Sequence, residues 1–141
     1  METKSNSVVV RPAPGFVHVY HYDTQSPEAP TFVETHSSNL DVVRAAYQEW
    51  TSFVRKVAVV ESYPGIVADI PRLDDAWERT NSIDAHWSEN NAVQAVNGLH
   101  RSSMVGDVMV LDDGRVFSVC GVGFAEIDRL PEDAPVEGWE E

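Results

Sequence analysis

Residues 101–127 (RSSMVGDVMVLDDGRVFSVCGVGFAEI) constrain the fold more strongly than any other stretch of the chain. Residues 107–111 form a short apolar run, and residues 115–120 return with alternating apolar and polar character. Between them lies Asp-Asp-Gly, in which Gly114 can adopt the positive φ that a tight chain reversal requires. These residues therefore predict a β-hairpin.

A second alternating stretch covers residues 16–22 and predicts a strand. One face of this strand carries Phe16, His18, Tyr20 and Tyr22, and the other carries Val17, Val19 and His21. Residues 31–35 (TFVET) are short and rich in β-branched side chains, so we expect them to form the partner strand of a first hairpin. Since the two histidines are predicted to face opposite ways, they do not suggest a shared site.

Residues 40–54 have the spacing of an amphipathic helix. Leu40, Val43, Tyr47, Trp50 and Val54 recur at intervals of three and four residues and predict one helix whose aromatic stripe faces the core. Candidate N-cap residues lie just before it at residues 37–39. A shorter helix is expected over residues 73–80, after Pro71, and residues 81–98 are expected to form an ordered loop.

These elements predict a single α+β domain over residues 1–130. We expect a small, mostly antiparallel sheet of about four to six strands, with one main helix packed on it and a second short helix. Residues 1–7 are polar and are expected to fray. Residues 131–141 are rich in acid and proline, which is typical of a flexible tail.

The net charge of −13 limits the classes of partner. Ten basic residues against 23 acidic ones disfavour direct binding of nucleic acid or of an anionic membrane, since both need clustered Lys and Arg. Seven acidic residues fall in the last sixteen positions. One cysteine excludes an internal disulfide, and no apolar run approaches the roughly 20 residues of a membrane span. We therefore expect a cytoplasmic protein in a host cell.

Catalytic chemistry has few candidates. Asp84, His86 and His100 offer carboxylate and imidazole ligands, but their spacing matches no recognised metal pattern. Cys120 lies mid-strand among apolar residues, where a free thiol is most often an inert buried side chain. Ser102 and Ser103 lack the Gly-x-Ser-x-Gly context of a nucleophile. No catalytic residue, metal ligand or cofactor is assigned, and a small metal-dependent enzyme stays an alternative.

A group of polar and aromatic residues precedes and opens the hairpin. Large apolar side chains there are spaced to pack against the hairpin, and Arg101 and Asp107 are expected to form a charge pair that fastens it to the preceding loop. If these residues instead line an exposed groove, they form a binding site. The candidate binding residues are Trp77, Asn81, Asp84, Trp87, Arg101 and Asp107.

Two stretches, AWERTNSIDAHWSEN (residues 76–90) and residues 101–127, resemble uncharacterised small proteins of actinobacterial phages and plasmids. In those proteins a segment with Trp and Asn precedes an R-S-x-S-V-G-D-V hairpin ending in G-F/W-x-E-I/V. The second stretch is also similar to the C-terminal part of the YodL-like domains of mobile elements. Met104 stands where the family usually has Ser or Thr. The family's function is unknown, so the resemblance implies a context and not a reaction.

The leading expectation is a non-enzymatic accessory protein of a phage or mobile element that binds a host factor through an aromatic or apolar patch. An acidic mimic of DNA, acting like an anti-restriction inhibitor on a nucleic-acid-binding protein, is the alternative that the charge suggests. The expected partner is thus a host or phage protein, with no direct contact to nucleic acid or membrane.

Overall fold

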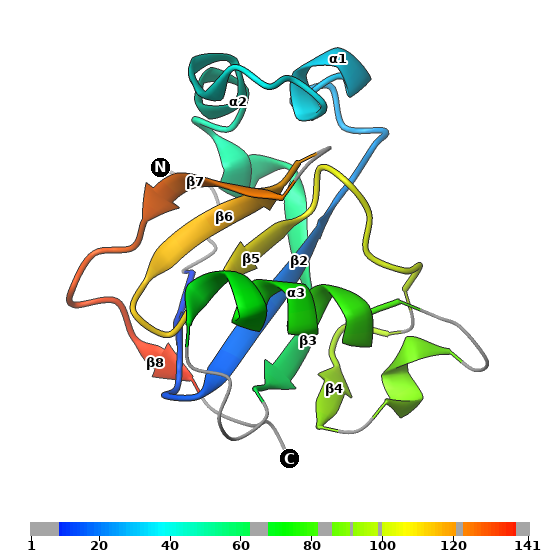
Figure 1. Ribbon diagram of the computed structural model, residues 1–141, viewed down its shortest axis with the longest axis vertical. Coiled ribbons are helices and arrows are strands. Elements are labelled where there is room, and N and C mark those ends of the chain that lie inside the picture. Colours follow the sequence, from blue (N-terminus) through cyan, green and yellow to red (C-terminus); the bar gives the residue numbers. More distant parts are fainter. Residues whose placement is uncertain are drawn as a thin grey trace, which may run out of the picture.

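The computed structural model describes residues 9–62, 68–81, 86–90, 92–98, 100–120 and 123–137. Its centre is one six-stranded antiparallel sheet with the strand order β4-β3-β2-β5-β6-β7 (Figure 1). The strands are β2 (Phe16–Tyr22), β3 (Val54–Glu61), β4 (Val93–Ala95), β5 (Val108–Val110), β6 (Arg115–Val119) and β7 (Phe124–Arg129). The α+β class and the antiparallel sheet are confirmed.

The predicted hairpin of residues 107–120 is present as β5 and β6. Val110 pairs with Val116, and the N–H of Gly114 donates to the carbonyl of Leu111 at 2.9 Å. Gly114 has a φ of +94°, a backbone conformation that costs L-residues free energy but is open to achiral glycine. The Asp-Asp-Gly signal therefore predicted both the place and the chemistry of this turn.

The first hairpin was predicted wrongly. Residues 31–35 do not pair with β2, which lies between β3 and β5. They form the short helix α1 (Phe32–Thr35), whose start is a capping box: the side chain of Thr31 accepts from the N–H of Glu34, and the side chain of Glu34 accepts from the N–H of Thr31. This reciprocal capping satisfies two otherwise unpaired backbone donors and outweighs the β-preference of the side chains.

The predicted long helix is shorter than its periodicity suggested. Helix α2 (Leu40–Ala46) is capped by Asn39, as expected, but the chain then turns through the 3-10 helix η1 (Trp50–Ser52) into β3. Residues 54–61 (VRKVAVVE) are rich in β-branched side chains and pair along the whole of β2. Tyr47 and Trp50 are nevertheless buried, so this part of the stripe faces the core as predicted.

The longest helix is α3 (Asp69–Arg79), which begins four residues earlier than the predicted 73–80. Pro71 lies in its first turn, where a missing N–H costs nothing because it has no helical partner. The expected loop after α3 contains the 3-10 helix η2 (Trp87–Glu89) and the edge strand β4. Figure 1 shows α3 lying across the sheet, with α1 and α2 together at one end of the molecule.

Among the described residues, buried apolar side chains pack in two clusters. The first contains Leu73 and Ala76 of α3 together with Val17, Val19, Val57, Ala58, Val60, Trp87, Met109, Leu111, Phe117 and Val119. The second contains Val43 of α2 together with Tyr20, Tyr47, Trp50, Phe53, Val108, Val110, Val116, Ala125 and Leu130. The alternation predicted for residues 16–22 is thus confirmed, because Val17 and Val19 join one cluster and Tyr20 the other.

The acidic C-terminal segment is held against the fold as far as Glu137. Strand β8 (Val136–Glu137) pairs in parallel with β1 (Arg11–Pro12), and the Arg11 side chain donates to the carbonyl of Pro131 at 2.7 Å. Residues 131–137 thus lie against β1, the flexibility of the acidic tail stays a prediction, and residues 1–7 and 138–141 lie outside the described part of the chain. Within the described residues, no helix combines the length and apolarity that crossing a membrane requires.

Candidate functional site

The carboxylate of Asp107 is the centre of a polar cluster just before β5. It has no exposed surface and accepts four hydrogen bonds. Two come from the Arg101 guanidinium at 2.8 Å each, and two from the backbone N–H groups of Tyr22 at 3.0 Å and Met104 at 2.7 Å. The predicted charge pair of Arg101 and Asp107 is confirmed. Burial raises the pKa of the Asp107 carboxyl, whereas all four donors favour its charged form.

Arg101 binds one carboxylate and two backbone carbonyls through the same guanidinium. Besides Asp107, it donates to the carbonyls of Ser102 at 2.9 Å and Tyr22 at 3.0 Å, and it lies 5.8 Å from the centre of the Tyr22 ring. This guanidinium therefore ties the approach to the hairpin to the end of β2, and its side chain is still about one third exposed.

A chain of hydroxyls links His21 to α3. His21 Nε2 lies 3.0 Å from Ser103 Oγ, which lies 2.7 Å from Thr80 Oγ1, and Thr80 Oγ1 lies 2.8 Å from the carbonyl oxygen of Ala76. A carbonyl only accepts, so Thr80 donates to Ala76 and Ser103 donates to Thr80. It follows that His21 carries its proton on Nε2, which is also 3.6 Å from Asp107 Oδ2.

His21 is a neutral imidazole. Burial lowers its pKa to about 3, and the positive charge of Arg101 and the neighbouring His100 act in the same direction. Its Nδ1 is buried and has no hydrogen-bond partner among the described residues. The ring centres of His21 and His100 are 6.2 Å apart.

A cavity of about 270 Å³ opens beside this cluster. Strands β2 and β3 supply two of its walls, and the segment before the hairpin supplies the third. The lining residues are His21, Tyr22, Asp23, Arg55, Val57, His100 and Arg101.

Of the five predicted binding residues that the structure describes, only Arg101 lines this cavity. Trp87 has no exposed surface, and its Nε1 donates to the carbonyls of His100 and Arg101, so it belongs to the core and not to an exposed groove. Trp77 packs against the same core, and Asn81 donates to the carbonyl of Trp77 at the end of α3. Asp84 lies outside the described residues.

The histidine and carboxylate group considered for a metal is not assembled in the described chain. His86 Nε2 lies 2.7 Å from the carbonyl oxygen of His100, and its Nδ1 accepts from the N–H of Ser88 at 3.1 Å, so both ring nitrogens hold the backbone. No cluster of three or more possible metal-ligating side chains occurs in the part of the chain that the structure describes. Cys120, expected to be buried, is half-buried.

Sequence reasoning missed His21, Arg55 and His100 as neighbours. His21 was compared only with His18, whereas its cross-strand partner is Arg55 in the antiparallel register of β2 and β3. The sequence does not predict that register, because it favours residues 31–35 as the partner of β2. No motif around His100 indicates that it lies beside His21.

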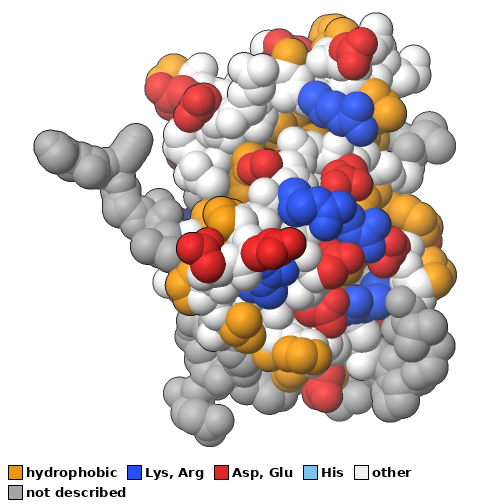
Figure 2. All heavy atoms as spheres, turned by 90° about the vertical axis from the view of Figure 1, so that its left-hand side faces the viewer, with side chains coloured by type: hydrophobic (Ala, Val, Ile, Leu, Met, Phe, Trp, Pro, Cys, Tyr) orange, Lys and Arg blue, Asp and Glu red, His pale blue; other side chains and the backbone are white. Residues whose placement is uncertain are grey.

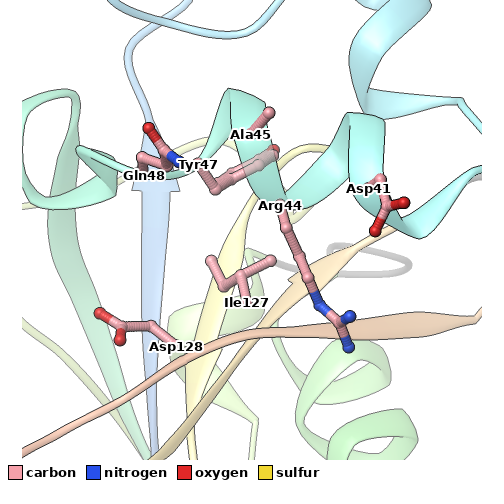
Figure 3. Close-up of a pocket in the computed structure, with 7 residues that line it drawn as sticks. All are labelled: Asp41, Arg44, Ala45, Tyr47, Gln48, Ile127 and Asp128. Carbon is pink, nitrogen blue, oxygen red and sulfur yellow. The ribbon is translucent and has the colours of Figure 1, made fainter.

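A second hollow of about 390 Å³ lies between α2 and β7, and Figure 3 shows the residues around it. Asp41 and Arg44 come from α2, while Ile127 and Asp128 come from β7. Arg44 Nε donates to the carbonyl of Glu126 at 3.0 Å, so its side chain bridges the two elements. The hollow is therefore lined by acidic, basic and apolar side chains.

Beside that hollow, the two short helices expose apolar side chains. We call Phe32, Val33, Leu40 and Val42 the α1–α2 patch; their exposed fractions are 73, 75, 47 and 39%. Elsewhere among the described residues, exposed large hydrophobic side chains occur singly, at Ile70, Met104 and Val136. A cluster of this kind on a small domain is typical of an interaction surface.

Charged side chains on the face in Figure 2 alternate in sign, with Lys or Arg beside Asp or Glu. The ion pairs of the described residues show the same mixing of charges, since Arg115 pairs with both Asp69 and Asp113. A surrogate for DNA requires a run of carboxylates spaced like phosphates and free of cations. The face shown does not have that arrangement.

Comparisons of this chain with protein-family models, with curated proteins and with solved structures gave no significant match.

Proposed function

We propose that the chain is a non-enzymatic accessory protein that acts by binding another protein through the α1–α2 patch. The observation that carries this proposal is the concentration of exposed apolar side chains: four of the seven large ones among the described residues fall within residues 32–42. Burying such side chains against a partner provides the main favourable free energy of protein association.

The patch is held in a defined shape, which lowers the entropic cost of binding. The capping box of Thr31 and Glu34 fixes the start of α1, and the Phe32 ring stacks on His36 with centres 3.9 Å apart. Asn39 caps α2 by accepting from the N–H of Asp41 at 2.9 Å. These local contacts present the apolar side chains on short helices that are ordered before a partner arrives.

Charge around the patch indicates the chemistry of the partner. Glu34 lies in α1 beside Val33, and the exposed Asp41 lies between Leu40 and Val42. A complementary surface would therefore carry apolar side chains with Lys or Arg at its rim. The net charge of −13 would also speed the approach of such a basic surface. The resemblance of residues 76–90 and 101–127 to phage and plasmid proteins supports a host protein as the partner.

The test compares Val33→Asp with Ile70→Asp. Both residues are exposed and both occupy the second position of a helix, where an aspartate is compatible with the helix dipole. The full-length proteins are used to capture partners from a host lysate, and any protein captured is then purified and titrated calorimetrically. We expect Val33→Asp to weaken binding about tenfold or more, since it removes an apolar contact and buries a charge, and Ile70→Asp to bind like the wild type.

Two results would contradict the proposal. One is equal affinity of the partner for both variants and the wild type. The other is a wild-type dimer in sedimentation that Val33→Asp dissociates, because the patch would then be covered by a second copy of this chain.

A further inference from the structure

We propose that the cavity beside His21 binds a small oxyanion of the phosphate type, either free phosphate or the terminal group of a phosphate monoester. The site consists of the cavity lined by Arg55 of β3, His100 and Arg101, and it shares no residue with the α1–α2 patch.

Arg55 supplies an uncommitted positive charge. Its side chain is exposed at the cavity, and within the described residues it makes no hydrogen bond or ion pair. In a chain with 23 acidic and 10 basic residues, most cations could find a carboxylate, and several arginines do. An arginine left unpaired beside a cavity is suited to a bidentate contact with an oxyanion.

The Arg101 guanidinium lines one side of the cavity in a fixed orientation. Four contacts to Asp107 and to two carbonyls hold its guanidinium in one orientation, so little conformational entropy is lost when a ligand binds beside it. Asp107 balances its charge. The carboxylate that lines the cavity is Asp23, which follows β2, is exposed and accepts the N–H of Gln25 at 2.9 Å.

The two histidines distinguish phosphate from a carboxylate ligand. His100 Nε2 lies 2.9 Å from the carbonyl oxygen of Val96 and donates to it, so in the neutral form of the ring Nδ1 is the nitrogen that carries a lone pair. His21 lines the cavity as a neutral ring. A phosphate that retains one proton offers charged oxygens to Arg55 and a P–OH donor to His100 Nδ1. An ionised carboxylate has no donor to offer.

The size of the cavity limits the ligand. About 270 Å³ is below the range of roughly 300–1,000 Å³ typical of sites for drug-sized molecules. There is room for one phosphate group and a few waters, and a phosphate monoester would extend out through the open side.

The experiment titrates the full chain with inorganic phosphate in a phosphate-free buffer, by calorimetry and by NMR of the histidine rings. Arg55→Gln is compared with Arg129→Gln, a matched control on the exposed end of β7, outside the cavity. We expect saturable binding that shifts the His100 ring signals. Arg55→Gln should lose about tenfold or more in affinity, the effect of removing one charge-assisted contact, and Arg129→Gln should not change it.

Acetate and a phosphate monoester are titrated in parallel. Binding of phosphate alone identifies the free anion as the ligand, and binding of the monoester identifies a terminal phosphate group; both support the proposal. Acetate binding as tightly as phosphate, phosphate binding equally to Arg55→Gln and the wild type, or the absence of saturable binding would each overturn it.

Discussion

Replacing His21 by glutamine should change how the stability of the protein depends on pH. In the folded chain the imidazole is buried beside Arg101, His100 and Asp107, and burial with the nearby positive charge lowers its pKa to about 3. In the unfolded chain the same group titrates near its ordinary value of 6.5. Between these two pH values the unfolded state therefore binds one proton more than the folded state.

The sign of the effect follows from this difference. Stability rises with pH wherever the unfolded state binds more protons, so the contribution of neutral His21 is complete above about pH 6.5 and is lost as the pH falls toward about 3. The slope is about 1.4 kcal/mol per pH unit. From about pH 6.5 to about pH 5 the wild type should lose about 2 kcal/mol through this one residue.

The free energy of unfolding can be measured by urea titration, using the fluorescence of the buried Trp50 and Trp87. Glutamine does not titrate and can still donate to Ser103, so His21→Gln should lose less stability than the wild type over the same pH range. Other groups titrate equally in both proteins and cancel in the comparison. Parallel loss of stability in the two proteins would refute a buried, neutral His21.

Three further substitutions test other contacts. Arg101→Met should lower the free energy of unfolding measured in urea by about 3–5 kcal/mol, because it leaves the fully buried Asp107 carboxylate without its cation. Arg129→Met, on the exposed end of β7, should change the free energy of unfolding by less than about 0.5 kcal/mol. Similar values for the two variants would contradict the role of Arg101 as the partner of Asp107. Thr31→Ala should cost about 1 kcal/mol locally and speed hydrogen exchange in α1, and unchanged exchange would argue against the capping box. Gly114→Ala should lower the thermal midpoint, since φ is +94° there and the left-handed conformation costs about 1–2 kcal/mol; an unchanged midpoint would exclude strain in this turn.

The elements that were predicted correctly have signals confined to a few consecutive residues. The hairpin is specified by the apolar runs on either side of Gly114, and the pair of Arg101 and Asp107 lies within the same segment. The error at residues 31–35 was avoidable, because Thr31 and Glu34 have the spacing of a capping box. The capping box decides the structure there in spite of the β-branched residues.

Other features depend on contacts between distant residues. Helical spacing over residues 40–54 could not show that α2 ends at Ala46, since that end follows from the pairing of β3 with β2. The cavity combines His21, Arg55 and His100 from three separate segments. None of these residues has a local motif: the register of β2 and β3 brings His21 beside Arg55, and the packing of the segment before β5 brings His100 to His21.

The parallel pairing of Arg11–Pro12 with Val136–Glu137 has a consequence for the order of folding. It connects residues about 125 positions apart, a closure whose entropic cost is compensated only after the intervening sheet has formed. Each of the two strands contributes only two paired residues, which add little stabilisation to this closure. We therefore expect the pairing of β1 with β8 to form last during folding and to open first when the native protein fluctuates.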